Sequence, residues 1–277
     1  MNYKEVPMTT PENHDAPSGL PAPASTPKPG DSYVQSFARG LEVIRSFSAA
    51  TPQQTLSEVA AQTGLTRAGA RRILLTLQTL GYVETDGKLF RLSPRILDLG
   101  FAYLSSLPIW NLAEPVMEDL VEEVRESSSA AVLDGLDIVY VLRVPTHKIM
   151  RTTLGVGSRL PACWTSMGRM LLAGLPDDEL QARLQGHSMQ RFTEHTTTDV
   201  DALLAHIRQA RQQGWCLVNQ ELEEGLISIA APLANRTGQT VAALNISGQA
   251  NRTSAAMMQE SLLPALLSAA RTISRMM

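Results

Sequence analysis

The chain has 277 residues, enough for two domains, and its 44% apolar content can fill a sizeable core. The formal net charge of −3 at pH 7 by itself argues against a nucleic-acid-binding protein. No apolar run approaches the ~20 residues of a membrane helix, and no basic-then-apolar signal pattern opens the sequence. Two cysteines are too few for a disulfide framework. We expect a cytoplasmic protein that does not associate with membranes.

Residues 1–30 differ in composition from the rest of the chain. They are rich in proline, threonine and serine and contain almost no large apolar side chains. Such a segment cannot bury enough surface to offset the entropy lost on ordering. We expect residues 1–30 to be a disordered tail.

Residues 55–80, TLSEVAAQTGLTRAGARRILLTLQTL, have the pattern of two short helices joined by a tight turn. Apolar residues recur at helical spacing on both sides of Gly64, which can take the positive φ that ends a helix. Thr66 offers a hydroxyl that can cap the second helix. One face of that helix is apolar, and the opposite face carries Arg67, Arg71 and Arg72.

The flanking segments complete the pattern of a winged helix-turn-helix. Residues 37–47 are a further amphipathic helix, and Asp86-Gly87 between two apolar runs is a strong hairpin signal. Segment 31–95 holds eight basic and five acidic residues, so positive charge concentrates there. The alternative is that these arginines only keep an exposed helix face soluble and contact no DNA. We expect residues 31–93 to bind double-stranded DNA through Thr66, Arg67, Arg71, Arg72, Lys88 and Arg91.

Residues 94–107 predict a linker helix that begins at Pro94, with Ser93 as its cap. The segment RILDLGFAYLSSL is apolar on more than one face, so the helix needs a surface to bury it. That surface is either a second copy of the same helix in a homodimer or another part of the same chain. The sequence leaves both possibilities open.

Residues 108–277 alternate between helical and strand-like periods. Strands, then helices, then strands again predict an antiparallel sheet flanked by helices, in the α+β class. The first predicted element is a helix at 111–127 with Leu112, Val116, Leu120 and Val124 on one face. A hairpin about 135–137, a strand at 149–153 and a loop at 155–168 follow, and then helices at 167–175, 177–184 and 199–213. The chain ends with a strand after Gly214, a hairpin over 235–239 and a last helix that is capped by Thr253 and kinked at Pro264.

Several stretches resemble the IclR family of bacterial transcriptional regulators: FARGLEVIRSF, LSEVAAQTGLTRAGARRILLTL, the wing ending in F-R-L-S, GSRLPACWTSMGRMLLA, and GLISIAAPL with AALNISG. The resemblance covers residues 33–277. It is greatest to the subgroup that governs the β-ketoadipate pathway of aromatic-acid breakdown. It implies a GAF-like second domain that binds protocatechuate, 4-hydroxybenzoate or β-ketoadipate and needs no cofactor. Trp164 stands where this pattern has a smaller residue, and we expect it to reshape the pocket.

The effector site is expected where Thr165–Gly168 enters a helix, because free N–H groups and the positive end of the helix dipole attract a carboxylate there. The resemblance gives this role to the main chain of Ser166 and Met167. Arg159 either pairs with a second carboxylate or bridges an exposed acid, and Arg143 and Arg151 are further choices. By resemblance, polar Ser228, Asn245 and Ser247 face the ligand, unless they simply face solvent, and Leu160, Trp164 and Met167 line its apolar part.

These features favour a ligand-responsive DNA-binding regulator that forms a homodimer or a homotetramer. The rival is an enzyme that processes a small acid and uses its basic segment only to dimerise. It would need an activated nucleophile, a metal or an acid–base pair, and the sequence offers no credible spacing for one, Cys163 included. A constitutive DNA-binding protein without a ligand is a third reading, and the helix start at Thr165–Gly168 argues against it.

Overall fold

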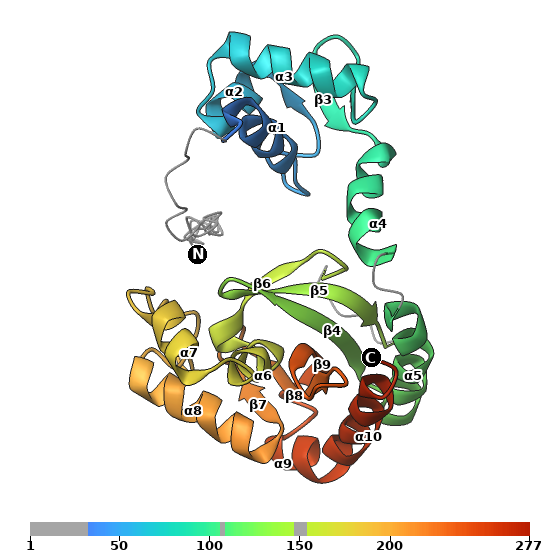
Figure 1. Cartoon of the computed structure of the whole chain (residues 1–277), viewed down its shortest axis with the longest axis vertical. Helices are drawn as coiled ribbons and strands as arrows, with labels where there is room; N and C mark the ends of the chain where they lie inside the picture. The colour runs from blue at the N-terminus through green and yellow to red at the C-terminus, as the bar shows by residue number, and fades with distance from the viewer. Residues whose placement is uncertain (1–32, 106–108, 147–153) are drawn as a thin grey trace, which may run out of the picture. The chain divides into compact units, whose positions relative to one another are not determined.

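The computed structural model describes residues 33–105, 109–146 and 154–277 (Figure 1). The chain divides between Arg95 and Ile96 into two compact units. The predicted tail at 1–30 and the predicted strand at 149–153 lie outside the described residues. The combination of a winged helix-turn-helix with an antiparallel sheet and flanking helices confirms the predicted α+β class.

The first unit is the predicted winged helix-turn-helix. Its three helices are followed by a hairpin, and a short strand before the second helix adds to the hairpin in the order β1-β3-β2. Local sequence did not reveal this two-residue strand. The elements are α1 (Gln35–Arg45), β1 (Gln54–Thr55), α2 (Leu56–Thr63), α3 (Arg67–Thr79), β2 (Val83–Thr85) and β3 (Leu89–Leu92).

The turn between α2 and α3 follows from local chemistry. Thr55 and Glu58 form a reciprocal capping box at the start of α2. Gly64 ends α2 in the left-handed region at φ 64°, and the Thr66 hydroxyl accepts a hydrogen bond from the Gly69 amide at 3.1 Å to begin α3. These signals fix where one helix ends and the next begins.

The wing forms at the predicted turn. The Asp86 carboxylate accepts hydrogen bonds from the amides of Lys88 and Leu89, both at 2.8 Å, and Gly87 has φ 96°. These backbone N–H donors lower the pKa of Asp86. The side chain and the glycine together set the hairpin's register.

The predicted linker helix is a 3₁₀ turn at Pro94–Ile96, which spans the boundary between the units, followed by α4 (Leu97–Ser105) in the second unit. Leu97 and Phe101 on α4 are 70% and 68% exposed, so the described residues of the chain do not bury them. Among the described residues no single helix is long and apolar enough to cross a membrane, and only the bent pair of Pro94–Ser105 with Ile109–Val124 would meet that test jointly.

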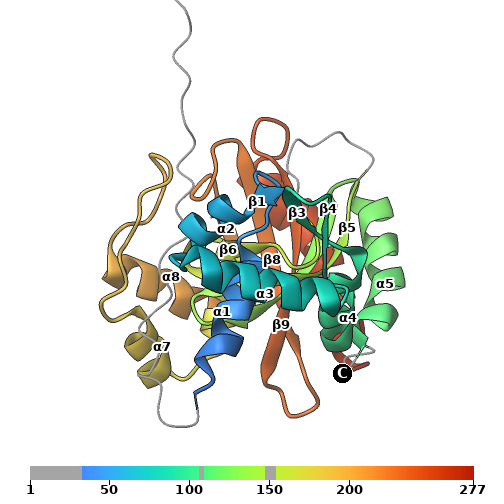
Figure 2. The same cartoon turned by 90° about the horizontal axis from the view of Figure 1, so that it is seen from above.

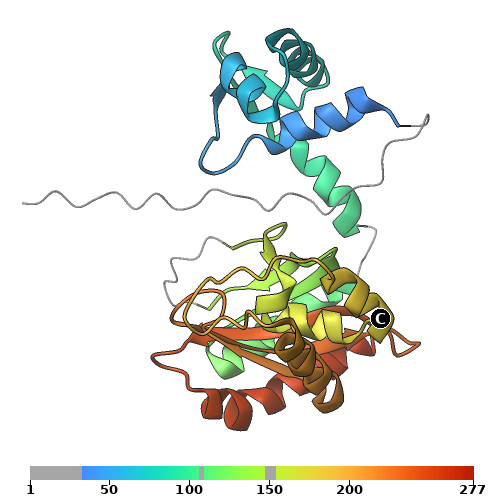
Figure 3. The ribbon, with the colours of Figure 1, turned by 90° about the vertical axis from the view of Figure 1, so that its left-hand side faces the viewer.

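A six-stranded antiparallel sheet in the order β6-β5-β4-β9-β8-β7 is the centre of the second unit. One core cluster joins α5 and α10 to one face, and another joins α6, α7 and α8 to the opposite face (Figures 1 and 3). Figure 2 shows β8 and β9 as a long hairpin. The elements are α5 (Ile109–Val124), β4 (Ser127–Asp134), β5 (Asp137–Val144), β6 (Arg159–Pro161), α6 (Ser166–Ala173), α7 (Asp177–Leu184), α8 (Val200–Gln213), β7 (Cys216–Asn219), β8 (Leu226–Ala234), β9 (Thr240–Gln249), α9 (Ala255–Met257) and α10 (Leu263–Ser274).

The helix predicted at 111–127 instead spans Ile109–Val124, and its buried face only partly matches the predicted one. Leu120 is buried as predicted, and Val116 and Val124 pack against the core, but Leu112 is 55% exposed and Trp110, Ala113 and Met117 are buried instead. The reason is geometric: a helix turns about 100° per residue, so a shift of one position moves the apolar stripe to a neighbouring face.

The loop predicted at 155–168 is also partly structured. Residues Arg159–Pro161 form the edge strand β6, which pairs with β5, and Ala162–Trp164 form a 3₁₀ turn called η2 here. Helix α6 then begins at Ser166, one residue earlier than predicted. A three-residue edge strand that contains a proline has no visible alternation, and proline is tolerated there because its neighbour strand is missing on one side.

The C-terminal helix begins one residue later than predicted. Ser254, not Thr253, caps it by accepting a hydrogen bond from the Met257 amide at 3.2 Å. The Thr253 hydroxyl instead donates to the buried Glu126 carboxylate at 3.3 Å. The predicted interruption is present as a π-helical turn at Met258–Leu262, directly before Pro264.

Close packing of α6 against η2 gives a test of this fold. A Cβ on Gly168 would clash with the backbone of Ala162, whereas a Cβ on Gly100 would meet no atom within 4 Å. Gly168→Ala should therefore destabilise the second unit by about 3 kcal/mol. Gly100→Ala, the matched control in α4, should be neutral or stabilise by up to ~1 kcal/mol. Thermal unfolding of the full chain measures both, and equal melting temperatures for the two variants would contradict the packing.

Candidate functional site

The exposed face of α3 carries the arginines expected to meet DNA. Arg67, Arg71 and Arg72 are all exposed and form no ion pair with the described residues. The opposite face places Leu74 and Leu77 in the core of the first unit. Three cations therefore lie on one free helix face, next to the Thr66 cap.

The wing contributes its two predicted cations unequally. Lys88 is exposed beside the hairpin turn. The Arg91 guanidinium instead donates to the Glu84 carboxylate across the hairpin, with Nη2 and Nε at 2.7 and 2.9 Å from Oε2. The sequence did not anticipate this pairing. Because an exposed pair contributes only roughly 0–1 kcal/mol, a phosphate can compete for Arg91.

A pocket in the second unit lies between the sheet and the start of α6. Among the described residues it collects every predicted effector-binding residue except Arg159, together with Leu160. It also contains residues that the sequence did not single out for this role. The lining residues are Tyr140, Arg143, Leu154, Leu160, Trp164, Thr165, Ser166, Met167, Val218, Glu221, Leu222, Leu226, Ser228, Asn245 and Ser247.

The start of α6 offers free backbone donors to this pocket. The Thr165 hydroxyl caps the helix by accepting from the Gly168 amide at 3.1 Å. The amides of Ser166 and Met167 form no hydrogen bond with other described residues, as expected in a first helical turn. The Ser166 hydroxyl donates to the Ser228 hydroxyl at 2.9 Å. This is the geometry of an anion site at a helix N-terminus.

The sheet wall of the pocket carries a row of buried polar side chains. Ser228 lies opposite Ser247 in the β8–β9 ladder, and Asn245 is two residues away on the same face. All three are less than 10% exposed, which contradicts the alternative that they face solvent. The Asn245 side-chain oxygen accepts from the Ser129 amide at 3.0 Å. Its amide nitrogen makes no hydrogen bond with a described residue.

Arg159 does not reach the pocket. Its guanidinium bridges two acids at the neighbouring hairpin, with Nη1 at 2.6 Å from Asp134 and Nη2 at 3.1 Å from Asp137. These carboxylates raise the pKa of Arg159 against the opposing effect of partial burial. Its edge strand brings it beside those acids, as in the alternative in which Arg159 bridges exposed acids. Arg151 lies outside the described residues.

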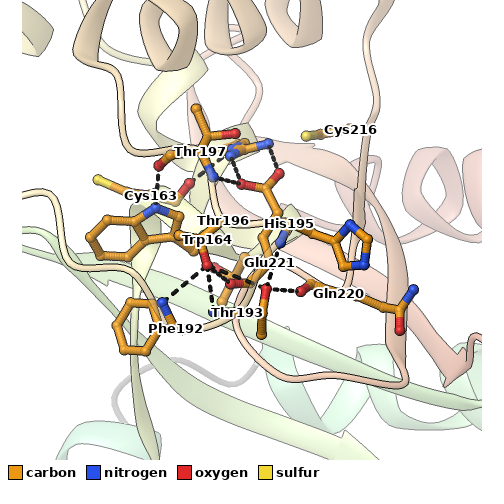
Figure 4. Close-up of polar contacts among 12 residues, drawn as sticks. Cys163, Trp164, Phe192, Thr193, His195, Thr196, Thr197, Cys216, Gln220 and Glu221 are labelled. Atoms are coloured by element: carbon orange, nitrogen blue, oxygen red, sulfur yellow. Dashed lines mark hydrogen bonds and ion pairs between the residues drawn. The ribbon is translucent and has the colours of Figure 1, made fainter.

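Trp164 forms a rigid part of the pocket wall. It is 2% exposed, its indole nitrogen donates to the Thr197 carbonyl at 2.8 Å, and it meets Phe192 edge-on with ring centroids 5.0 Å apart (Figure 4). His187 lies on another side, with centroids 6.0 Å apart. These contacts hold the large side chain in one place.

An ion pair that the sequence did not reveal lies behind Trp164. Arg169 is 2% exposed, and its Nη1 and Nη2 each lie 2.7 Å from an oxygen of Glu221, while its Nε donates to the Cys163 carbonyl at 2.8 Å. The Thr197 amide donates to the same carboxylate at 2.9 Å (Figure 4). Burial raises the pKa of Glu221, but the charge and hydrogen bonds of Arg169 outweigh it and lower the pKa overall. The one sequence feature that could have indicated a buried ion pair is an arginine within the apolar run SMGRMLLA.

Hydrogen bonds from two threonines hold segment 192–197 beside this ion pair. The Thr193 hydroxyl donates to the Gln220 carbonyl at 2.6 Å, and the Thr196 hydroxyl donates to the Glu221 carbonyl at 2.7 Å (Figure 4). Both hydroxyls also accept from nearby backbone amides. The segment is thereby tied to the chain after β7.

The cysteines are buried in the second unit. Burial raises the pKa of Cys163 to about 12 and that of Cys216 to about 11. Their thiols therefore stay protonated and poorly nucleophilic near neutral pH. Among the described residues no three His, Cys, Asp or Glu side chains gather as a metal site.

Comparison with known proteins decides the family. The IclR helix-turn-helix domain matches residues 36–87, and the C-terminal domain of the bacterial transcriptional regulator IclR matches residues 101–275. The chain belongs to the IclR family. The resemblance predicted from the sequence is thus confirmed, and the α3 face and the pocket fall in the two matched regions.

Individual IclR relatives agree with the predicted subgroup. The Pca regulon regulatory protein of Pseudomonas putida is 41% identical over 87% of this chain and 83% of its own length. A transcriptional regulator from Rhodococcus sp. RHA1 has a solved structure that is 53% identical, with a TM-score of 0.79 over 88% of this chain and 98% of its own. An IclR homologue from Microbacterium hydrocarbonoxydans, solved with 4-hydroxybenzoate, is 25% identical, with a TM-score of 0.75 over 87% and 98% of the chains.

The buried ion pair predicts a pH-dependent stability. Glu221→Gln leaves the Arg169 charge buried without a partner and should destabilise the second unit by about 3–5 kcal/mol at pH 7. Because folding lowers the pKa of Glu221, its contribution is complete above about pH 4.5 and is lost as the pH falls through the folded value. The difference between the variant and the wild type should therefore shrink in acid.

Glu224→Gln is the matched control, because Glu224 is an exposed neighbour on the same loop. Its unfolding free energy should stay within about 0.5 kcal/mol of the wild type. Denaturant unfolding between pH 3 and pH 7 measures all three proteins. A Glu221→Gln variant as stable as Glu224→Gln at pH 7 would contradict the role given to the pair.

Proposed function

We propose that this IclR-family chain regulates transcription of aromatic-acid catabolic genes by binding operator DNA and is controlled by a small carboxylic acid such as 4-hydroxybenzoate, protocatechuate or β-ketoadipate. The observation that carries the proposal is the buried pocket at the start of α6, where the free amides of Ser166 and Met167 meet Ser228, Asn245 and Ser247. The names and the bound acid of its relatives support the same effector class.

DNA binding rests on the free face of α3. Arg67, Arg71 and Arg72 can donate to phosphates or guanine edges while the buried face of α3 stays packed in its own unit. Lys88 and Arg91 in the wing would contact the adjacent backbone. Thr66 keeps its hydroxyl hydrogen available for a phosphate, since its oxygen only accepts from Gly69.

Self-association is part of this proposal. Helix α4 exposes Leu97, Leu99 and Phe101, and α1 exposes Phe37. Apolar helix faces of this kind are normally covered, and a second copy of the chain is the occupant that would also supply a second recognition helix. We therefore favour a homodimer, with a homotetramer as the larger alternative.

Catalysis is not part of the proposal. The pocket has one carboxylate, Glu221, and Arg169 and Thr197 already occupy it. Cys163 is buried, with its pKa raised to about 12. Neither group is placed as a general acid, a general base or a nucleophile, so the pocket suits binding and release of an unchanged acid.

The effector class can be tested by thermal unfolding with 4-hydroxybenzoate, protocatechuate and β-ketoadipate, and with benzoate as a control. A ligand at ~100 times its dissociation constant should stabilise the protein by roughly 2.7 kcal/mol, a shift of a few degrees. At least one of the three acids should produce this shift, and the acid should be recovered unchanged. No shift with any of them would contradict the proposal, and product formation would revive the enzyme alternative.

Arg71→Ala tests the DNA half. We expect it to weaken binding to DNA selected from a random library by the wild type by about 1–3 kcal/mol, with effector affinity unchanged. Arg252→Ala, an exposed arginine of the second unit, is the matched control and should bind that DNA normally. Band-shift titrations at fixed salt and calorimetry measure the two affinities. Equal loss of DNA binding in both variants would contradict the assignment of α3.

A further inference from the structure

Two polar side chains of the pocket have hydrogen-bonding capacity that the described part of the chain does not use. Tyr140 is only 5% exposed, yet its hydroxyl makes no hydrogen bond with a described residue. Arg143 uses Nη1 to donate to the Ser129 hydroxyl at 3.2 Å and forms no ion pair with a described residue. A buried hydroxyl such as that of Tyr140 costs free energy unless a ligand completes its hydrogen bonds, and the half-buried Arg143 has N–H donors free to do the same for a ligand.

A β-bulge brings these two side chains together. Tyr140 and Arg143 are three residues apart on β5, so a regular strand would point them to opposite faces of the sheet. Ala130 pairs with Leu142 and Ala131 pairs with Tyr140, which leaves Val141 as an extra residue. Both Tyr140 and Arg143 consequently line the pocket, while Val141 and Leu142 pack in the core on the other face.

The pair lies away from the anion site at α6. Ser166 at the start of α6 is bonded to Ser228 on β8, and Tyr140 and Arg143 lie on β5. In the strand order, β4 and β9 separate β5 from β8. Because neighbouring strands are about 4.8 Å apart, the three spacings from β5 to β8 separate the two strands by about 14 Å along the sheet. An elongated ligand can contact both.

Their electrostatics suit an oxygen-bearing group. Burial raises the pKa of Tyr140 to about 12, with the Arg143 charge acting in the opposite direction, so the hydroxyl is neutral and can donate or accept. The Arg143 guanidinium has N–H donors left and no described carboxylate to neutralise it. Glu221 in the same wall is already paired with Arg169.

We propose that Tyr140 and Arg143 form a second polar subsite, which binds the end of the effector opposite the carboxylate held at α6. It would accept a hydroxyl or a second carboxylate and would discriminate against an acid of the same shape that lacks that group. This inference rests on the proposed function and deepens it, because it names the residues that choose among small acids.

Calorimetry with ligands that differ only at the far end tests the subsite. The aromatic set is benzoate, 4-hydroxybenzoate and terephthalate, and the open-chain pair is hexanoate and adipate. The variants are Tyr140→Phe and Arg143→Gln. Tyr82→Phe, in the first unit, and Arg159→Gln, on the sheet edge outside the pocket, make the same chemical changes elsewhere. Melting curves confirm that each variant is folded.

The subsite predicts a coupling between side chain and ligand group. The wild type should prefer 4-hydroxybenzoate to benzoate, or adipate to hexanoate, by about tenfold or more. Tyr140→Phe should remove most of the preference for the hydroxyl, and Arg143→Gln should remove most of the preference for the second carboxylate. Affinity for benzoate or hexanoate should change less than about twofold, and the two control variants should behave as the wild type.

Two results would overturn the inference. One is a wild type that binds these acids without preferring the oxygen-bearing member of either set. The other is a pair of pocket variants that weaken all ligands equally, which would give Tyr140 and Arg143 a merely structural role. A wild type that binds none of the five acids, and neither protocatechuate nor β-ketoadipate, would contradict the proposed effector class itself, and the subsite with it.

Discussion

The buried ion pair between Arg169 and Glu221 is the interaction on which the second unit's pocket depends. Glu221 lines the pocket, and an unneutralised carboxylate there would repel an acidic ligand in a medium of low dielectric constant. Two bonds of 2.7 Å from Arg169 remove that repulsion. The same pair joins α6, η2 and the chain after β7. A pocket that binds an acid can therefore contain Glu221 only because Arg169 neutralises its charge.

The Arg169–Glu221 ion pair determines which positively charged or hydrogen-bond-donating groups remain for a ligand. Arg169 is fully engaged and Arg159 is held by two exposed acids, so the free amides at the start of α6 and the Arg143 guanidinium are left. Trp164 is fixed through Thr197, whose amide in turn binds Glu221. Shape and charge in the pocket are thus set by one connected group of side chains, and a preorganised group of this kind favours selectivity.

The sequence was informative where the cause of a structure is local. Gly64, Thr66 and Asp86-Gly87 act on their immediate neighbours, and these residues were enough to place α2, α3 and the wing. The period of two along β9 was enough to put Asn245 and Ser247 on one face. The change from loop to helical pattern at Thr165–Gly168 was enough to locate the start of α6 within one residue.

Features that depend on distant partners could not be read in this way. Glu221 is 52 residues from Arg169, and nothing in either neighbourhood identifies the other. Tyr140 was missed because a bulge breaks the alternation that the sequence pattern assumes. The place of Arg159 depends on β6 pairing with β5, and a three-residue strand ending in proline carries no periodic signal. Tertiary pairing decides all three cases.

We propose that one chain couples an acid-binding pocket to a DNA-binding helix. Linkage requires that an effector change operator affinity by the same factor as the operator changes effector affinity. The direct measurement is therefore a closed set of four affinities: effector binding with and without saturating operator DNA, and operator binding with and without saturating effector. The account predicts two equal factors of roughly fivefold or more. An acid that binds in the pocket and leaves operator affinity unchanged would contradict it.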